Sequence, residues 1–380
     1  MQQNLTSYKV CLTTLSPLFI GAGEEHLLSP YSDFIQHGDS LIYIDTERLQ
    51  EAIQDESTLV EAFVKGMRQF ENNRSTFSLE KFIIGTLGKE IDDFATRVVR
   101  VDGDIQKNHI RKFISTGGNP FIPGSSLKGS IRSAVLLDWL QNTKEGKKQL
   151  AEIKMHVEKR DWISLKRVAP ERACFGGISN DVFKYLRISD SEVIAKSCLS
   201  VSAMKRVSLL SGRKSLRRKA SDIPQWSETL QPLTTTKILL SIATPKGKTS
   251  FSFLNERSGS SLFTIVNKIS LDSCLRELDE LEGIKEFSDF FRFYQDIEDK
   301  IHALESNEAI LRLGGGKTWF DNSIGLSIDS EDFGPDYLFG EYLKLLRIGN
   351  LPFPSTRSAI VKNDVPTNPL GWVKLTVLDA

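Results

Sequence analysis

The stretch Phe121–Val135, with the sequence FIPGSSLKGSIRSAV, is the part of the chain around which the fold is organised. Pro123 and Gly124 predict a tight turn after a strand, because proline fixes φ and glycine permits unusual backbone angles. Ser125 is a residue type that caps helices, and apolar residues follow it at helical spacing. These apolar residues are Leu127, Ile131, Ala134 and Val135. The stretch therefore predicts a strand end, a turn and the start of a helix.

Two cations lie on this predicted helix. Lys128 and Arg132 are four residues apart and share a face. A cation in the first turn opposes the helix dipole, which favours an anion at that end. A phosphate docked there, held by the Gly124 backbone, by Ser125 and Ser126, and by Lys128, explains the arrangement. An ordinary capped helix with a solvated lysine explains the same residues, so both interpretations stay open.

The length and charge of the chain limit the classes of protein to which it can belong. The chain has 380 residues, enough for two domains of ordinary size. Lysine plus arginine and aspartate plus glutamate each number 49, so the net charge is zero. Zero net charge argues against a globally basic nucleic-acid-binding protein and leaves local basic patches as the expected footprint.

The cysteines and the hydropathy pattern indicate a cellular compartment. The cysteines are scattered, form no CxxC pair and give no zinc signature, which is typical of a chain in a reducing cytoplasm. No apolar run reaches the length of a membrane span, and the N-terminus lacks a signal-peptide core. We therefore expect a cytoplasmic protein with no membrane segment, no metal and no cofactor.

Two further segments of the chain are rich in glycine. Gly21 and Gly23 follow an apolar run, which predicts a backbone that bends tightly or approaches a ligand closely. The second segment contains GKT, but the Walker pattern requires a glycine at position 311, where this chain has leucine. We expect this second segment instead to cradle a phosphate through its backbone and two cations. Its residues are Arg312, Gly314, Gly315, Gly316 and Lys317.

The most basic part of the chain lies between residues 205 and 219. Its cations are Lys205, Arg206, Arg213, Lys214, Arg217, Arg218 and Lys219. Runs of like charge are usually solvated or partly disordered loops. The concentration of cations in a neutral chain favours contact with a polyanion.

Hydrophobic periodicity predicts alternating regions of strand and helix. We expect strands at Tyr8–Leu15, Asp33–Gln36, Ser40–Ile44, Val182–Ile188, Val193–Ala203, Leu233–Ile242, Thr249–Leu254 and Trp372–Leu378. We expect helices at Thr46–Glu71, Ser78–Val99 and Lys144–Lys166, and a helix-rich region at Leu262–Leu304.

Five sequence motifs carry a family resemblance. They are SPLFIGAG (Ser16–Gly23), FIPGSSLKGSIRSAV (Phe121–Val135), YLRISDS (Tyr185–Ser191), ETLQPLTT (Glu228–Thr235) and LRLGGGKTWFDNSIG (Leu311–Gly325). Together they resemble the RAMP superfamily of CRISPR effector proteins. Within that superfamily, the chain is most similar to the fifth subunits of type III-A Csm complexes.

The resemblance implies an α+β fold of tandem ferredoxin-like, RRM-type RAMP domains with helical insertions. We place an N-terminal domain at residues 1–200, with an insertion at about 46–112. We place a C-terminal domain at residues 201–380, with the basic segment as a thumb loop and a helical insertion at about 262–304. The aromatic signature of RRM domains is absent from the sequence, which favours RNA contact through loops and helix N-termini.

The resemblance also implies a function in antiviral defence. Such a subunit would grip the 3′ side of a CRISPR RNA, support maturation of its 3′ end, and form part of a ribonucleoprotein. The implied partners are CRISPR RNA, target RNA, the backbone RAMP subunits and host nucleases. Contacts to phosphates suit a guide RNA, because phosphates carry no sequence information. A scaffold that contacts mainly proteins is compatible with this function.

A ribonuclease is the alternative hypothesis. Related RAMP proteins cleave RNA with histidine or with aspartate, and Asp33 lies roughly where the backbone subunits carry their aspartate. His26 and His37 are close in sequence to the first glycine turn. Family members often carry histidine where this chain has Phe19. The sequence contains no complete catalytic set, and Asp33 is equally a residue type that caps a loop.

Overall fold

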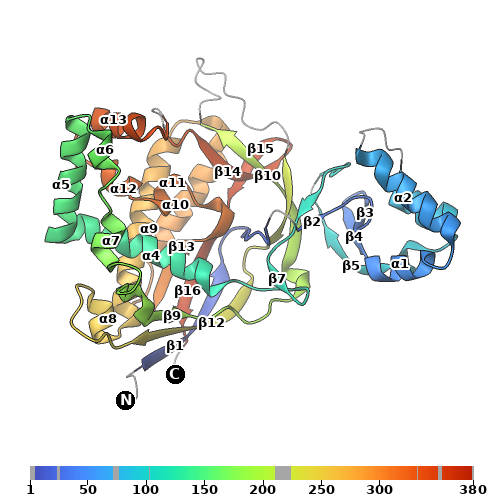
Figure 1. The fold of residues 1–380 in the computed structure, drawn as a ribbon, viewed down its shortest axis with the longest axis horizontal. Coiled ribbons are helices and arrows are strands. Elements are labelled where there is room, and N and C mark those ends of the chain that lie inside the picture. The colour runs from blue at the N-terminus through green and yellow to red at the C-terminus, as the bar shows by residue number, and fades with distance from the viewer. Residues whose placement is uncertain are drawn as a thin grey trace.

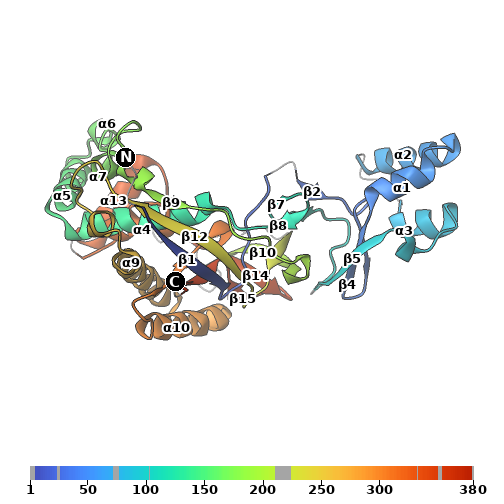
Figure 2. The same cartoon turned by 90° about the horizontal axis from the view of Figure 1, so that it is seen from below.

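The protein consists of a large body and a smaller lobe, which the computed structural model shows side by side along the longest axis (Figure 1). The structure describes residues 5–23, 26–71, 77–101, 103–209, 224–331, 333–349 and 353–378. The body contains two sheets and most of the helices, and the lobe extends away from it (Figure 2). The mixture of helices and sheets confirms the predicted α+β class.

The first sheet of the body is five-stranded, in the order β13-β16-β1-β12-β9. Its strands are β1 (Leu5–Thr14), β9 (Leu186–Ile188), β12 (Thr235–Ala243), β13 (Glu308–Arg312) and β16 (Trp372–Val377). All neighbouring strands are antiparallel, and Val10 of β1 lies between Ile238 of β12 and Val377 of β16. Val10 and Leu12 are buried on one face, as the alternation of β1 predicts. The strands predicted at both ends of the chain are therefore confirmed.

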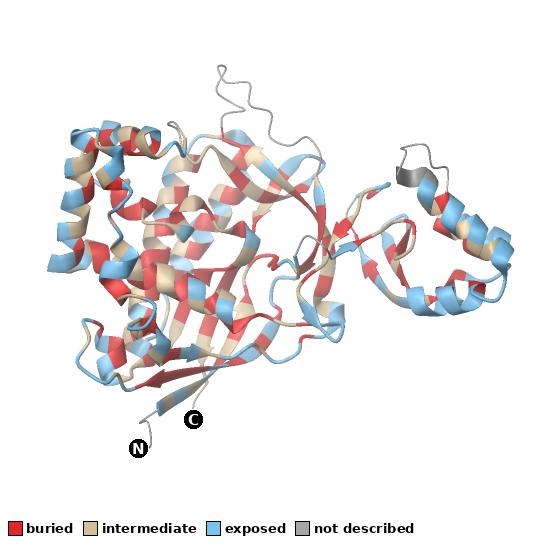
Figure 3. Cartoon of the chain, viewed as in Figure 1, coloured by how far each residue is buried: buried red, intermediate tan, exposed pale blue. Residues whose placement is uncertain are grey.

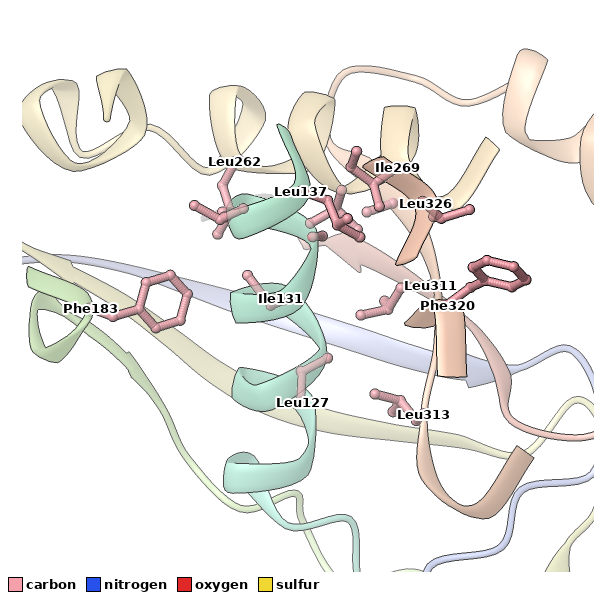
Figure 4. Close-up of a cluster of buried hydrophobic side chains, with 14 of the residues drawn as sticks. Leu127, Ile131, Leu137, Phe183, Leu262, Ile269, Leu311, Leu313, Phe320 and Leu326 are labelled. Atoms are coloured by element: carbon pink, nitrogen blue, oxygen red, sulfur yellow. The ribbon is translucent and has the colours of Figure 1, made fainter. Parts of the chain in front are cut away.

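Two long helices complete this first layer, α4 (Gly124–Asn142) and α9 (Gly259–Leu281). In chain order, β1, α4, β9, β12, α9 and β13 follow the strand–helix–strand–strand–helix–strand pattern of ferredoxin-like folds. β16 is an additional strand inserted between β13 and β1. Leu127 and Ile131 of α4 share a hydrophobic cluster with Leu311 and Leu313, as Figure 4 shows. The predicted apolar stripe of α4 is therefore the face that covers the sheet.

The second sheet of the body is six-stranded, in the order β15-β14-β10-β11-β6-β2. Its strands are β2 (Leu27–Leu28), β6 (Ile110–Arg111), β10 (Leu199–Ser208), β11 (Gln225–Leu230), β14 (Thr356–Lys362) and β15 (Val365–Pro369). Phe290 and Tyr294 of α10 (Ser288–His302) pack in one cluster with Val201 and Ala203 of β10. The aromatic cluster of α10 is thus part of a hydrophobic core, as expected for aromatic residues at helical spacing.

Both sheets combine strands from the two halves of the chain. β1 pairs with β12 in the first sheet, and β6 pairs with β11 in the second. The predicted division after residue 200 therefore does not separate the two sheets. The tandem repetition of a ferredoxin-like domain stays a prediction.

The lobe is built on the three-stranded sheet β3-β4-β5. Its elements are β3 (Phe34–His37), β4 (Ser40–Ile44), β5 (Ala95–Arg100), α1 (Thr46–Ile53), α2 (Ser57–Glu71), α3 (Leu79–Lys81) and a π-helical turn, Phe82–Thr86. Ile35, Leu49 and Ile83 lie in its own small core, whereas the outer faces of α1 and α2 are exposed (Figure 3). The lobe thus has a small hydrophobic core of its own, while Phe34 and Tyr43 on its sheet pack in one cluster with Val201 of the body.

A buried carboxylate connects the lobe to the body. Glu228 of β11 accepts hydrogen bonds from the Tyr43 hydroxyl (2.8 Å) and from the Phe113 N–H (3.0 Å). It also forms an ion pair with Arg97, whose guanidinium lies 3.8 Å from the centre of the Tyr43 ring. Burial and the neighbouring Glu228 raise the pKa of Tyr43 well above its ordinary value. The Tyr43 hydroxyl therefore stays protonated and able to donate.

Shorter elements cover the rest of the body. They are α5 (Lys144–Glu158), α6 (Trp162–Leu165), α7 (Pro170–Phe175), α8 (Ser252–Glu256), α11 (Trp319–Asn322), α12 (Gly325–Ile328), α13 (Asp336–Leu346) and the hairpin of β7 (Ser115–Thr116) with β8 (Asn119–Pro120). Across the ranges that the structure describes, we find no helix with the length and apolar character of a membrane span.

Several predicted elements differ from the structure, and the helices predicted at Thr46–Glu71 and Lys144–Lys166 are each divided into two. The helix predicted at Ser78–Val99 ends at Thr86, and Ala95–Arg100 is strand β5, where alternating residues pair with β4. The strand predicted at Thr249–Leu254 is wrong, because α8 begins at Ser252 and buries Phe253 and Leu254. The two strands predicted after Val182 begin late, at Leu186 and Leu199. In each case the period of the hydrophobic pattern was compatible with both structures over a short run.

Candidate nucleic-acid interface

The N-terminus of α4 is satisfied by a carboxylate of the chain itself. The N-cap is Pro123, not Ser125 as the sequence predicted, and no side chain caps from that position. The Gly124 N–H donates to Oδ1 of Asp190 at 2.8 Å. A Cβ atom on Gly124 would lie 2.4 Å from the carbonyl oxygen of Ile188, so glycine is required for this close approach.

The exposed side of the α4 N-terminus carries the remaining predicted residues. Ser125 is exposed, and Ser126 and Lys128 are half-buried. The Lys128 ammonium lies 5.8 Å from the centre of the Phe183 ring. Burial lowers the pKa of Lys128, and the nearby Asp181 opposes that shift. Lys128 is therefore partly shielded from water but remains accessible from solvent.

Arg132 is held by contacts within the protein. Its Nε donates to Glu171 at 2.8 Å, and its Nη1 lies 3.0 Å from Oδ2 of Asp181. Its guanidinium also stacks on Phe175, 3.9 Å from the ring centre. These contacts connect α4 with α7 and the turn before β9, so Arg132 has a structural role that the sequence did not indicate.

The two glycine-rich segments meet around Phe19. The Gly315 N–H donates to the Phe19 carbonyl oxygen at 2.9 Å. Gly314 has a φ of 67°, and a Cβ atom there would lie 2.2 Å from the same oxygen. Gly21 and Gly315 are both exposed beside the Phe19 ring, which is itself only 3% exposed. We call Phe19, Gly21 and Gly314–Gly316 the glycine junction.

An arginine from the second sheet covers the glycine junction. The Arg111 guanidinium lies 4.8 Å from the centre of the Phe19 ring, and its Nη1 donates to Gln225 at 3.1 Å. Arg111 is half-buried. Gly23, with a φ of 108°, follows in the same loop. The junction therefore places a cation at a fixed position beside the exposed main chain of Gly21, whereas the Gly315 N–H is already used by the Phe19 carbonyl oxygen.

Arg312 lies in the core, and the prediction that it contacts a phosphate does not fit its burial. Its side chain is 2% exposed and forms ion pairs with Glu277 and Asp321. Its Nε donates to the Leu370 carbonyl oxygen at 3.1 Å. Arg357 donates to the other oxygen of Glu277 at 2.6 Å. Arg312 thus supports the glycine junction from beneath.

Lys317 also turns inward from the glycine-rich segment. It lies among residues that include Arg312 and Asp321, around a cavity of about 30 Å³. Burial lowers the pKa of Lys317, while the negative charge of Asp321 opposes the shift. Gly316 packs against the Leu370 backbone, because a Cβ atom there would lie 2.1 Å from the Leu370 carbonyl oxygen.

The structure describes only the start of the basic segment. Lys205 forms an ion pair with Asp364 at 3.0 Å. Arg206 is exposed on β10 and forms no ion pair with any residue that the structure describes. The predicted contacts Arg213, Lys214, Arg217 and Arg218 lie outside the described residues.

The nuclease candidates are engaged in local contacts. Oδ2 of Asp33 accepts the Ser29 N–H at 2.6 Å, which closes a turn before β3. His37 contacts Glu80 at 2.9 Å, and His26 is exposed. Within the described ranges, we find no cluster of His, Cys, Asp and Glu arranged to hold a metal.

A family model of the RAMP superfamily matches residues 11–320, which include the glycine junction and the start of α4. The chain belongs to the RAMP superfamily. The resemblance of the five motifs is therefore confirmed at the level of the superfamily.

Two proteins named CRISPR system Cms protein Csm5 are similar to this RAMP chain. The protein from Methanocaldococcus jannaschii is 26% identical over 417 residues, covering 100% of this chain and 91% of its own length. The protein from Streptococcus thermophilus is 25% identical over 269 residues, covering 68% of this chain and 70% of its own length. These matches confirm the similarity to fifth subunits.

Two solved structures share the fold of this RAMP chain. One is a chain in a cryo-EM structure of a Csm–crRNA–target RNA ternary complex from a type III-A system, with a TM-score of 0.70 and 22% identity. The other is the crystal structure of Csm5 from T. onnurineus, with a TM-score of 0.65 and 22% identity. Each comparison covers 97% of this chain and 100% of the other.

Two residues of this RAMP site were missed at the level of sequence. Arg111 lies in a polar linker, and nothing in its neighbourhood signals that it stacks on Phe19, 92 positions earlier in the chain. Asp190 follows Gly124 by 66 residues, and only the fold brings the two together. Its position in the SDS triplet at the end of a predicted strand was the available signal, because such residues often cap helices.

Proposed function

We propose that this chain is a non-catalytic CRISPR RNA-binding subunit of a type III-A Csm complex, working in the cytoplasm. It caps the 3′ side of the guide RNA and supports maturation of the 3′ end. The observation that carries the proposal is the glycine junction, where the exposed Gly21 lies beside the Arg111 guanidinium and the exposed Gly315 lies beside the Phe19 ring that this guanidinium covers. Main-chain groups and a fixed arginine bind phosphates without reading bases, as a variable guide requires.

The arrangement of charges supports the same function. Arg312 and Arg357 are neutralised in the core by Glu277 and Asp321. Arg111, which is half-buried, and Arg206, which is exposed, instead lie outside the core on strands β6 and β10 of the same sheet. Lys128 offers a further cation at the start of α4. We propose these three side chains as contacts to RNA phosphates.

The proposed partners follow from the similar proteins. A chain with the same fold occurs in a Csm–crRNA–target RNA ternary complex. We propose CRISPR RNA as the ligand of the glycine junction, and target RNA and backbone RAMP subunits as its neighbours in the complex. Host nucleases that trim the 3′ end would approach the RNA beside this subunit.

A salt titration of RNA binding tests the proposal. We would measure the affinity of labelled CRISPR RNA for the full chain at several salt concentrations, with Arg111→Ala/Arg206→Ala as the test variant. The test variant should bind more weakly, with a slope of log affinity against log salt that is shallower by roughly one unit, because fewer counterions are released. Lys144→Ala/Lys148→Ala, which removes two exposed cations of α5, is the charge-matched control.

Two outcomes would overturn the proposal. The first is an unchanged slope and affinity in the Arg111/Arg206 variant, with melting curves that show an intact fold. The second is an equal loss in the test and control variants, since that would indicate a general charge effect and not a defined interface.

A further inference from the structure

A cavity of about 630 Å³ lies between α5 and α9, which is within the range of about 300–1,000 Å³ typical of small-molecule sites. We call it the α5–α9 cavity. α5 lies at the end of the body opposite the lobe in both views (Figures 1 and 2). Among its lining residues are Gln141, Lys147, Lys154, Lys268, Asp272, Ser327 and Phe333. None of them belongs to the glycine junction or to the start of α4.

The walls of the α5–α9 cavity carry three lysines. Lys147 and Lys154 are seven residues apart on α5 and therefore share a face, and Lys268 lies opposite them on α9. Lys268 forms an ion pair with Asp138 at 3.5 Å. Lys147 and Lys154 form no ion pair with residues in the described ranges. Their two charges are therefore available to a ligand.

Acidic residues do not cancel these charges. Asp272 is the acidic residue among those that line the cavity. Burial raises the pKa of its carboxyl group, and the charge of Lys268 opposes that shift. With Lys268 balanced by Asp138, and even with Asp272 ionised, the two lysines of α5 leave the cavity with an excess of positive charge.

Ser327 provides a second and independent indication of a ligand. Its side chain lines the cavity although the residue is only 1% exposed. Among the described residues, its Oγ has no hydrogen-bond partner. A buried hydroxyl without a partner costs free energy unless water or a ligand satisfies it. The hydroxyl thus adds a buried polar group to the two unpaired lysines.

The remaining lining residues suit a ligand with an organic part. Phe333 is buried and offers an aromatic surface, and the Gln141 amide, which also hydrogen-bonds the Asp272 carboxyl group, offers a further polar group. We propose that the α5–α9 cavity binds a phosphorylated small molecule the size of a mononucleotide. Lys147 and Lys154 hold the phosphate as point charges, while Phe333 and the polar groups contact the remainder. This site is separate from the proposed RNA interface.

Calorimetric titration of the full chain with AMP, ADP and inorganic pyrophosphate tests the proposal. We expect binding of at least one of these probes in the wild-type protein. Lys147→Ala/Lys154→Ala should weaken it by roughly tenfold or more, because two charge-assisted contacts are lost. Ser327→Ala should weaken it less, without lowering the melting temperature, since the deleted hydroxyl has no protein partner.

The control variant is Lys144→Ala/Lys148→Ala, which removes the same charge from exposed positions of α5 outside the cavity. It should bind the probes as the wild-type protein does. The proposal falls if no probe binds at millimolar concentration, or if the control loses as much affinity as the test variant. It also falls if an acidic peptide binds and the three probes do not. CRISPR RNA binding should be unchanged in the Lys147/Lys154 variant, so failure here is distinguishable from failure of the proposed function.

Discussion

The backbone N–H of Gly315 donates a hydrogen bond to the carbonyl oxygen of Phe19 at 2.9 Å, which joins segments almost 300 residues apart in sequence. Beside it, the Leu313 N–H donates to the Gly371 carbonyl oxygen and the Gly371 N–H donates to Pro17. Three separate parts of the chain thus meet backbone to backbone. Glycine permits such contacts, because a side chain would occupy the space between the two backbone segments.

Gly314→Ala should destabilise the protein more than the same substitution at the exposed Gly21 of the glycine junction, where a Cβ atom would meet only the Phe19 and Arg111 side chains. The residue has a φ of 67°, and a Cβ atom would lie 2.2 Å from the Phe19 carbonyl oxygen. Backbone strain alone costs about 1–3 kcal/mol, and the clash adds to it. Chemical denaturation measures the loss. Gly247→Ala is the control, because no atom lies within 4 Å of a Cβ atom there and the residue is exposed. Equal stability of the two variants would contradict the packing role.

Arg312→Leu should lower the free energy of unfolding by roughly 3–5 kcal/mol, because Glu277 and Asp321 would keep buried charges without their partner. Arg206→Leu is the matched control at an exposed position. It should change the free energy of unfolding by about 0.5 kcal/mol or less. In a double-mutant cycle, Asp321→Asn should cost less in the Arg312→Leu background than in the wild-type protein. If the two substitutions have additive effects on the free energy of unfolding, Arg312 and Asp321 do not interact energetically.

The sequence predicted those elements whose signal is local. The alternation of Val10 and Leu12 identified β1, and the stripe of Leu127 and Ile131 identified α4. The sequence around Arg312 contains no feature that distinguishes a buried arginine from an exposed one, so Arg312 was predicted to contact a phosphate. Its partner Glu277 comes from α9, 35 residues earlier, and only the packing of α9 against β13 brings them together.

The sequence indicates that the segments around Gly124 and Gly314 need glycine, but it does not show what these glycines contact. Gly124 was expected to permit a turn and Gly314 to help cradle a phosphate, whereas in the structure their missing side chains make room for backbone carbonyl groups. A sequence shows that a position needs glycine, but the same conformational freedom serves a ligand and a packed chain equally well. The stacking of Arg111 on Phe19 depends on the same long-range packing.

Lys317→Met should raise the melting temperature near neutral pH, and the gain should shrink as the pH approaches the ordinary lysine pKa. Burial lowers the pKa of Lys317 in the folded protein. Between the lowered pKa of the folded protein and the ordinary lysine pKa, the unfolded chain binds more protons than the folded one. A rise in pH within this window therefore increases the free energy of unfolding of the wild-type protein. The methionine variant lacks this contribution. Melting curves at several pH values compare the two chains. A less stable variant at neutral pH would show that attraction to Asp321 outweighs desolvation.

Glu228→Gln should loosen the attachment of the lobe to the body. The substitution removes the charge that pairs with Arg97 and replaces one of the two carboxylate oxygens with an amide NH2 group, so only one of the donors, the Tyr43 hydroxyl or the Phe113 N–H, keeps its acceptor. Breaking a buried ion pair is strongly destabilising, since the remaining charge loses its compensation. Limited proteolysis should release lobe fragments faster than in the exposed control Glu192→Gln. Identical cleavage patterns would indicate that the hydrophobic contacts alone hold the lobe.

Asp190 allows the two interpretations of the α4 N-terminus to be separated. Its carboxylate accepts the Gly124 N–H at 2.8 Å, so Asp190→Ala should cost about 0.5–2 kcal/mol of stability through loss of the cap. Asp190→Asn retains an acceptor and should cost much less. Both variants remove a negative charge at the N-terminus of α4. If an RNA phosphate lies at this helix end, as we propose, Asp190→Asn should therefore bind RNA more tightly at low salt.

The tighter binding of Asp190→Asn should require Lys128. Adding Lys128→Ala should remove the gain, because the lysine is the cation that holds the phosphate near the helix. Glu286→Gln is the control, since it removes an exposed negative charge far from α4 in sequence, beside α10, and should leave RNA affinity unchanged. Titrations of labelled RNA at two salt concentrations, with melting curves alongside, give both quantities. If Asp190→Asn keeps its stability and binds RNA no better than the wild-type protein, Asp190 is the permanent anion of this helix and no phosphate docks there.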